Sequence, residues 1–201
     1  MAEPTKWVTQ TAAGHSQWYI QRFRDLAASG ADLAGEARLV DAMVPPGSRV
    51  LDAGCGTGRL GAELAARGHE VVGVDADPEL IAAAAEDHPG PRWLVADLAD
   101  PLLLADHAQD RFHAIVVAGN VMTFLADGTH QQVLRNLRDQ LEPDGVILVG
   151  FGAGRGYPIT EFDRDVTAAG LELEHRFATW DLRPWDEASE FAVSVLRVPG
   201  R

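Results

Sequence analysis

From residue 48 onward, the chain alternates short runs of β-branched and other apolar residues with alanine-rich segments. The apolar runs predict strands at residues 49–53, 70–75, 92–96, 114–118 and 146–151. Apolar side chains between these runs follow the spacing of amphipathic helices, at residues 58–68, 77–88 and 129–141. Strands separated by helices are joined by right-handed crossovers, which give a parallel sheet with helices on both faces. Because the strands are apolar almost throughout, the pattern predicts an α/β, doubly wound fold with a sheet buried on both sides.

The end of the chain departs from this alternation. Residues 171–180 and 190–198 are both strand-like, and no helical pattern separates them. The simplest interpretation is a C-terminal antiparallel hairpin, in which one strand runs against the direction of the main sheet.

Residues 1–47, which we call the leader, precede the first predicted strand. Helical patterns at 14–30 and 32–44 are followed by Pro45-Pro46-Gly47, a sequence that stops a helix. The leader is rich in aromatic residues, and two interpretations are open. Either these side chains simply pack on the domain, or part of the leader covers a ligand crevice as a lid. A chain of 201 residues without an evident linker predicts a single domain, with the leader (1–47) packed on residues 48–201.

The charge and the cysteine content narrow the class of partner. The formal net charge is −13, from 30 acidic and 17 basic side chains, so we expect no nucleic-acid partner. Cys55 is the single cysteine, which excludes an intrachain disulfide and a cysteine-based zinc site. The seven histidines show no metal-binding spacing, and we expect no metal.

The sequence gives no sign of membrane insertion or export. The first residues lack the apolar core of a signal peptide, and no apolar run is long enough for a transmembrane helix. We therefore expect a cytoplasmic protein, either a monomer or a homodimer.

Four glycines follow the first predicted strand in the stretch VLDAGCGTGRLG: Gly54, Gly56, Gly58 and Gly61. Glycine tolerates positive φ and has no Cβ, so the backbone of such a loop can approach a ligand closely. In open parallel sheets, ligands bind beyond the carboxyl ends of the strands, and an acid ending the next strand accepts from ribose hydroxyls. Asp75 ends the next predicted strand. Together these features predict a site for a nucleoside or nucleotide.

Two kinds of ligand compete for this loop. From Gly56, the stretch GTGRLG satisfies the GxGxxG pattern of dinucleotide sites. However, Asp52 just before the loop would face a pyrophosphate unfavourably, and a ligand with sulfonium and ammonium groups favourably. The first glycine after the strand is Gly54, and from there the dinucleotide spacing fails at Arg59. The residues favour the cationic ligand, and an NAD(P)-dependent oxidoreductase is the alternative.

The stretch VLDAGCGTG resembles motif I of the class I S-adenosylmethionine-dependent methyltransferases, an apolar run followed by an acid and GxGxG. The similarity continues over most of residues 36–151 in the stretches VVGVDADPELIAAA, WLVADL, FHAIVVAGNVMTFL and LEPDGVILVGF. It implies a Rossmann-like, doubly wound, seven-stranded and mostly parallel sheet with an antiparallel last strand, as the hairpin also suggests. It also implies S-adenosyl-L-methionine as the cofactor and S-adenosyl-L-homocysteine as the product.

The resemblance further implies roles for individual residues. Asp75 is expected to bind both ribose hydroxyls, and Asp97 to accept from the exocyclic amine of adenine. Tyr19 or Arg22 of the leader is a candidate for the cofactor's carboxylate. The expected cofactor-binding residues are Tyr19, Arg22, Asp52, Gly54, Cys55, Gly56, Gly58, Asp75, Ala76, Asp77, Ala96, Asp97, Leu98, Ala118, Gly119 and Asn120.

Plainer roles compete with these assignments. Asp75 can cap the turn before Pro78, and Asp97 can be an ordinary loop carboxylate. Asp52 can act on the ligand through water or only hold the loop. Cys55 has no adjacent base in the sequence, so we expect its backbone to matter more than its sulfur.

The sequence says less about the molecule that accepts the methyl group. Methyltransferases of DNA adenine and of protein amides typically carry Asn/Asp-Pro-Pro-Tyr after the fourth strand, whereas this chain has AGNVMTF. With the acidic charge, this favours a small-molecule acceptor, modified at an O, N or C atom. The same loop lacks the paired acids of a metal-assisted enzyme. Candidate residues of the acceptor pocket are His15, Trp18, Tyr19, Arg22, Asn120, Phe124, Arg155, Tyr157, Trp180, Asp181, Arg183 and Trp185.

No catalytic base is evident. His15, Tyr19 and Asn120 are the candidates, and a solvated or helix-capping histidine is the plainer interpretation of His15. Three functions therefore stay open: a small-molecule methyltransferase, which we predict, the oxidoreductase, and a non-catalytic member that only binds the cofactor.

Overall fold

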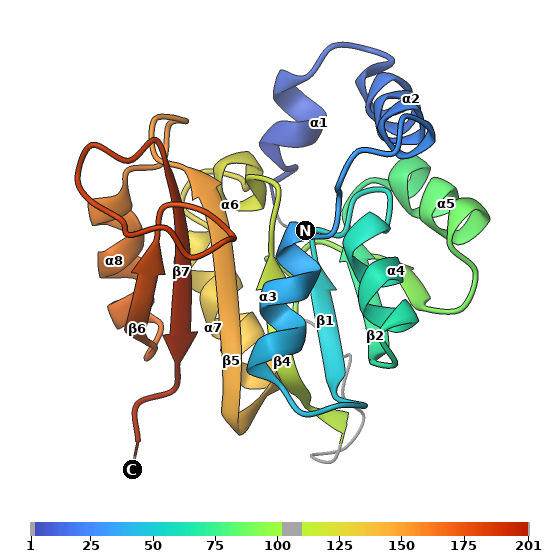
Figure 1. Ribbon diagram of the computed structural model, residues 1–201. Coiled ribbons are helices and arrows are strands. Elements are labelled where there is room, and N and C mark those ends of the chain that lie inside the picture. Colours follow the sequence, from blue (N-terminus) through green and yellow to red (C-terminus); the bar gives the residue numbers. More distant parts are fainter. Residues whose placement is uncertain (1–2, 102–109, 201) are drawn as a thin grey trace.

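The computed structural model describes residues 3–101 and 110–200 (Figure 1). Its centre is a seven-stranded sheet of order β3-β2-β1-β4-β5-β7-β6. The strands are β1 Arg49–Ala53, β2 Glu70–Asp75, β3 Arg92–Val95, β4 Phe112–Val117, β5 Leu141–Gly152, β6 Glu172–Phe177 and β7 Phe191–Arg197. Strand β7 runs antiparallel to both β5 and β6, and the neighbouring pairs from β3 to β5 are parallel. The doubly wound, seven-stranded sheet with its C-terminal hairpin is therefore confirmed.

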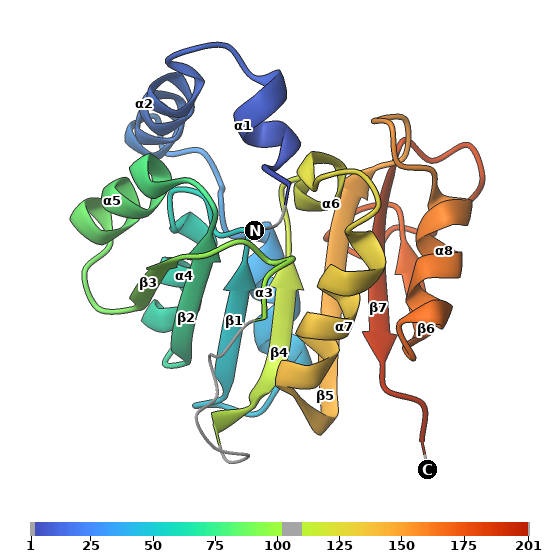
Figure 2. The same ribbon diagram turned by 180° about the vertical axis from the view of Figure 1, so that it is seen from behind.

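Helices cover both faces of this sheet. α3 (Gly35–Met43) and α4 (Arg59–Ala66) lie on one face, where they share a core cluster with Val50, Val71 and Ala114. α7 (His130–Gln140) and α8 (Ile159–Ala168) cover the other face, seen from behind in Figure 2. Side chains of successive strand residues enter opposite clusters, which explains why the strands are apolar at nearly every position.

Three helices are absent from the sequence prediction: α1 (Lys6–Gln10), α6 (Val121–Phe124) and α8. The first two are too short to show a helical period, whereas α8 buries Phe162 and Val166 at helical spacing and was missed. Strand β5 also begins earlier than expected, at Leu141. Its pairing with β4 shifts register between Phe112 and Ala114, so a bulge places the expected Pro-Asp-Gly turn inside the strand.

The leader divides into two parts. α3 packs directly on the sheet, whereas α1 and α2 (His15–Ala28) lie beyond the carboxyl ends of the strands (Figures 1 and 2). We call the segment from α1 through α2 the roof. α2 rests on α5 (Pro78–Asp87) through a small cluster of Ile20, Leu80 and Ala83. Within the described residues, no helix has the length and apolar character needed to cross a bilayer.

Candidate active site

The glycine loop (residues 54–58) follows β1 and depends on its glycines. Gly54, Gly56 and Gly58 have φ values of +80°, +55° and +77°. A Cβ on Gly54 would lie 2.3 Å from Cγ2 of Val121, a distance that real side chains do not reach. The backbone N–H groups of Gly54 and Cys55 donate to the carbonyl of Val74, at 2.7 and 3.0 Å, so β2 holds the loop from below. The bare backbone of Gly54 and Gly56 faces a cavity.

Asp75 closes the loop from the end of β2. Its Oδ2 accepts from the Gly56 N–H at 2.9 Å, and its Oδ1 accepts from the Asp77 N–H at 2.9 Å. Burial raises the pKa of this carboxyl, while these backbone donors favour its charged form. Each carboxylate oxygen can accept more than one hydrogen bond, and Asp75 lines the cavity. It is therefore placed to accept from two adjacent hydroxyls of a ligand.

Asp52 lies beneath the loop. It is 1% exposed, and its Oδ2 accepts from the Gly61 N–H of α4 at 3.0 Å. Burial raises the pKa of Asp52 to about 7, and the nearby positive charge of Arg59 opposes this shift. Asp52 is not among the residues that line the cavity. Its hydrogen bond to Gly61 therefore favours the second role considered for Asp52, which is to hold the glycine loop in place.

The cavity has a volume of about 480 Å³ and is lined both by residues at the carboxyl ends of the strands and by residues of the roof. The strand ends, the loops that follow them and α5 contribute Gly54, Gly56, Asp75, Ala76, Leu80, Ala96, Asp97, Leu98, Ala118, Gly119 and Asn120. We call this set the floor. The roof and the residues just before it contribute Thr5, Trp7, His15, Trp18, Tyr19, Arg22 and Phe23. The remaining lining residues are Arg59, Val121, Phe124, Leu125 and Arg155.

Most of the residues expected to bind the cofactor thus meet at one cavity, and Asp52, Cys55, Gly58 and Asp77 do not line it. Cys55 is 7% exposed, and burial raises the pKa of its thiol, which agrees with a role for its backbone alone. Gly58 is needed for packing, because a Cβ there would lie 2.8 Å from Cη2 of Trp93. Asp77 caps α5 by accepting from the Glu79 N–H at 2.8 Å.

Asp77 also fastens the roof. Its Oδ2 accepts from Nε1 of Trp7 at 2.8 Å and from Oγ of Ser16 at 2.5 Å. These hydrogen bonds favour the charged form, and the pKa of Asp77 is lowered despite partial burial. One carboxylate therefore joins α1, α2 and α5, only two residues beyond Asp75.

Aromatic side chains around Trp7 line the cavity on the roof side, and we call Trp7, His15, Tyr19 and Phe124 the ceiling. The ring of Trp7 meets His15, Tyr19 and Phe124 at centroid distances of 4.7, 5.4 and 5.3 Å. Trp7 and Phe23 were not predicted as site residues, and the only signal for them was the aromatic content of the leader. Arg59 was missed as well. It begins α4 and donates to the Leu33 carbonyl at 2.8 Å and to Glu36 at 2.5 and 3.1 Å, which joins the loop to the leader.

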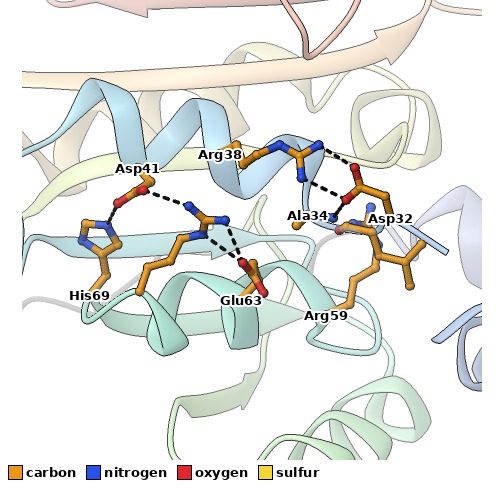
Figure 3. A network of polar contacts seen from close by, with 9 residues as sticks. Asp32, Ala34, Arg38, Asp41, Arg59, Glu63 and His69 are labelled. Atoms are coloured by element: carbon orange, nitrogen blue, oxygen red, sulfur yellow. Dashed lines mark hydrogen bonds and ion pairs between the residues drawn. The ribbon is translucent and has the colours of Figure 1, made fainter. Parts of the chain in front are cut away.

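A polar network extends this junction along α3 and α4 (Figure 3). Arg67 of the α4 C-terminus reaches Asp41 at 3.0 Å, and Asp41 also contacts Nε2 of His69 at 3.0 Å. Arg38 binds Asp32 with both terminal nitrogens, at 2.9 and 2.7 Å. The Arg67–Asp41 contact attaches α3 to the helix that follows the glycine loop, whereas the Arg38–Asp32 pair lies within the leader.

The residues proposed for the acceptor pocket divide into two groups. The cavity includes His15, Trp18, Tyr19, Arg22, Asn120, Phe124 and Arg155. It does not include Tyr157, Trp180, Asp181, Arg183 or Trp185, so the expectation for these residues needs correction.

The reason is that these side chains have partners elsewhere. Tyr157 is 2% exposed, stacks on His130 at 4.0 Å and donates to Asp165 at 2.7 Å. Trp180 covers the glycine at position 150 of β5, and the Arg176 guanidinium lies 5.2 Å from the ring of Trp185. Trp180 therefore packs on the face of β5 and Trp185 lies against the edge strand β6, and neither lines the cavity.

The floor and the ceiling fit a nucleoside cofactor. A carboxylate at the end of β2 can accept from hydroxyls, the glycines leave the backbone accessible, and a cavity of about 480 Å³ falls within the usual range of ligand sites. In the ranges 3–101 and 110–200, no group of three or more His, Cys, Asp or Glu side chains is arranged to hold a metal ion.

An open, doubly wound sheet with a roofed cavity where the strand order reverses defines the class: a nucleoside-binding α/β protein of Rossmann-like architecture. Comparison with known proteins agrees. A family model described as "Methyltransferase domain" matches residues 50–145. The crystal structure of a TehB-like SAM-dependent methyltransferase from Corynebacterium glutamicum is 46% identical, covers 94% of this chain and 100% of that chain, and superimposes with a TM-score of 0.87.

Two further relatives are less similar. The CcbJ methyltransferase from Streptomyces caelestis shares the fold, with 23% identity, 82% of this chain and 94% of that chain covered, and a TM-score of 0.73. Magnesium-protoporphyrin O-methyltransferase from Rhodobacter capsulatus is 40% identical over 98 residues, 44% of each chain. The matched segments cover 44%, 60% and 37% of the lengths of three curated relatives. The chain belongs to the S-adenosylmethionine (SAM)-dependent methyltransferase family.

Proposed function

We propose that this protein transfers the methyl group of SAM to a small-molecule acceptor that binds beside the cofactor in the roofed cavity. One observation carries the proposal: the glycine loop and Asp75 both line the same cavity, and the roof covers that cavity. The acidic charge of −13 and the covered cavity support a small molecule rather than a nucleic acid as acceptor. We extend the proposal to a cytoplasmic protein that acts as a monomer or a homodimer.

The residues that would hold the cofactor follow from the cavity lining. Asp75 would accept from the ribose hydroxyls, and Asp97 from the adenine amine. Oδ1 of Asp97 accepts from the Ala99 N–H at 2.9 Å, which fixes the orientation of the carboxylate. Ala76, Ala96 and Leu98 would flank the adenine. When bound, SAM supplies an electrophilic methyl group on a sulfonium.

On the side of the methionine moiety, the backbone of Gly54 and Gly56 would approach the cofactor. Ala118 and Gly119 complete this wall. Tyr19 and Arg22 lie one turn apart on α2, and Arg22 would pair with the cofactor's carboxylate. Burial raises the pKa of Tyr19, so its hydroxyl stays protonated at neutral pH and acts as a donor rather than a base.

The protein's own chemical tasks are alignment of the acceptor, exclusion of water and removal of a proton where the acceptor carries one. Asn120 is no base, and its Oδ1 already accepts from the Gly152 N–H at 2.7 Å. His15 is the remaining candidate base. Its ring lines the cavity between the rings of Trp7 and Trp18, and within the described chain its imidazole nitrogens have no hydrogen-bond partner.

Calorimetric titration with S-adenosyl-L-homocysteine (SAH) tests this function. We expect the wild type to bind SAH, and Asp75→Ala to weaken binding about 100-fold or more, because two charge-assisted hydrogen bonds are lost. Glu187→Gln, at an exposed position of the hairpin loop, is the matched control and should bind as the wild type does. Thermal unfolding without ligand checks that Asp75→Ala still folds.

Other outcomes would identify the competing functions. Tighter binding of NAD than of SAH would overturn the proposal in favour of an oxidoreductase. SAH binding without methyl transfer to any member of a metabolite panel would favour a non-catalytic member of the family.

A further inference from the structure

Arg155 follows β5, and its side chain borders the cavity; in the sheet, β4 separates β5 from β1, the strand that leads into the glycine loop. A Cβ on Gly152 would lie 3.1 Å from Cδ and 3.2 Å from Nε of Arg155, so the side chain runs across the end of β5. Within the part of the chain that the structure describes, its guanidinium has no hydrogen bond and no ion pair. Arg155 is exposed, and its guanidinium is accessible to an anion in the cavity.

Asn120 adds a second donor group at the same place. Its Oδ1 accepts from the N–H of Gly152 at 2.7 Å, which fixes the plane of the amide. The Nδ2 group therefore has two N–H donors, and no acceptor for them lies among residues 3–101 and 110–200. Asn120 and Arg155 thus meet at Gly152, and both line the cavity. The wall at the ends of β4 and β5 carries donors and a positive charge without a protein acceptor.

The other arginines of the cavity are accounted for. Arg59 is neutralised by Glu36, at 2.5 and 3.1 Å. Arg22 lies on α2 one turn from Tyr19, whose ring is 3.5 Å from where a Cβ of Gly56 would be. The Arg22 guanidinium lies 5.5 Å from the centroid of the Trp18 ring. The proposed function assigns Arg22 to the carboxylate of the cofactor. SAM carries one carboxylate, and the charge of Arg155 is left for another anion.

The surroundings of this wall limit what that anion can be. Trp7 and Phe124 meet edge to face at 5.3 Å above the cavity, and His15 lies against Trp7. Such a ceiling contacts a flat or apolar body, while a planar guanidinium pairs best with a planar carboxylate. An inorganic anion would use the donors but not the aromatic rings.

We propose that the methyl acceptor is a small organic carboxylate, bound through its carboxylate by Arg155 and the side-chain amide of Asn120, with its apolar part under Trp7 and Phe124. This inference rests on the proposed function, because it assumes that the cofactor occupies the glycine-loop side. It names Arg155 as the residue that selects the charge of the acceptor.

The test uses acid and amide pairs of equal shape as probes. SAH-loaded protein is titrated with benzoate and benzamide, and with indole-3-acetate and indole-3-acetamide. In at least one pair, the acid should bind about ten-fold or more tightly than its amide, because only the acid can form a charge-assisted pair with the guanidinium. Arg155→Gln should weaken binding of that acid about 10- to 100-fold and leave the amide unchanged, while Arg155→Lys keeps part of the affinity.

Two controls separate this inference from the proposed function. Arg164→Gln removes an exposed arginine of α8 that does not line the cavity and should alter nothing. SAH affinity should be the same in wild type and Arg155→Gln. If acids and amides bind equally in both pairs, or if Arg155→Gln leaves acid binding unchanged, the inference is overturned while SAH binding still supports the methyltransferase. Failure of the wild type to bind SAH contradicts the proposed function itself.

Discussion

The floor and the roof of the cavity are built on different physical principles. The floor is a backbone structure, in which main-chain bonds to Val74 and the carboxylates of Asp52 and Asp75 fix a loop of left-handed glycines. The roof is held by side chains: two hydrogen bonds to Asp77, ion pairs between α2 and α5, and aromatic contacts. A backbone structure admits few sequences, whereas side-chain contacts of this kind can be made by many. The floor is therefore recognisable from sequence and the roof is not.

Among substitutions in the floor, we expect Gly54→Ala to have the largest effect. A methyl group there would lie 2.3 Å from Val121 in a residue with φ of +80°, so we expect SAH binding to be lost and stability to fall by about 3 kcal/mol. Urea unfolding and calorimetry measure both effects. Gly14→Ala is the matched control: its φ is +81° but nothing lies within 4 Å, so it should cost only about 1 kcal/mol.

A second-site change sharpens this result. Val121→Ala removes the two methyl groups nearest to the introduced Cβ and should restore part of the stability of Gly54→Ala. If the double variant is no more stable than Gly54→Ala, the clash is not the cause of the loss.

A pH series tests the carboxylate beneath the floor. The pKa of Asp52 rises from 3.8 to about 7 on folding, so the native state holds its proton more tightly than the unfolded state. The contribution to stability is then greatest at low pH and is lost as pH rises from about 4 through 7. Relative to Asp52→Asn, which does not titrate, the wild type should lose about 2–3 kcal/mol of unfolding free energy between pH 5 and pH 8. Parallel pH profiles of the two proteins would contradict a raised pKa.

The roof is tested by Asp77→Asn. An asparagine keeps an oxygen for the Glu79 N–H at the start of α5, but its NH₂ group then faces the donors Trp7 Nε1 and Ser16 Oγ. We expect a loss of about 1–2 kcal/mol and faster hydrogen exchange in Lys6–Ala28, with β1 and β2 amides unaffected. Trp7→Phe, which deletes one of the donors, should show the same pattern more weakly. Equal exchange changes in roof and floor would show that the two regions do not open separately.

The smallest effect is expected at the outer edge of the roof. Arg24 pairs with Asp87 at 2.8 Å and with Glu86 at 3.1 Å, but its side chain is 40% exposed. Exposed ion pairs contribute little, so Arg24→Gln should leave the unfolding midpoint nearly unchanged in both low and high salt. A clear loss at low salt only would mean that these pairs do hold α2 in place.

The difference between floor and roof also explains which parts of the structure the sequence could predict. The alternation of apolar runs and helices, with the glycines and Asp75, was sufficient for the sheet and for most of the floor, because those positions are set by backbone geometry. The bulge in β5 was missed, since Pro143-Asp144-Gly145 has the local preference of a turn and only pairing with β4 keeps these residues in the strand. Trp180 and Trp185 were candidates for the pocket, but Trp180 packs on Gly150 of β5, which is distant in sequence, and Trp185 lies against Arg176 of β6.

The position of Trp7 has a practical consequence for enzymology. Its indole N–H is tied to Asp77 while its ring borders the cavity, whereas the indole of Trp93 is bound to the His88 carbonyl and Trp180 and Trp185 belong to the hairpin. Trp18 also lines the cavity, so the intrinsic emission contains two fluorophores, Trp7 and Trp18, whose surroundings change whenever the cavity fills or the segment above it lifts. Comparison of the wild type with Trp7→Phe isolates the contribution of Trp7 and gives a label-free, stopped-flow record of ligand arrival and departure.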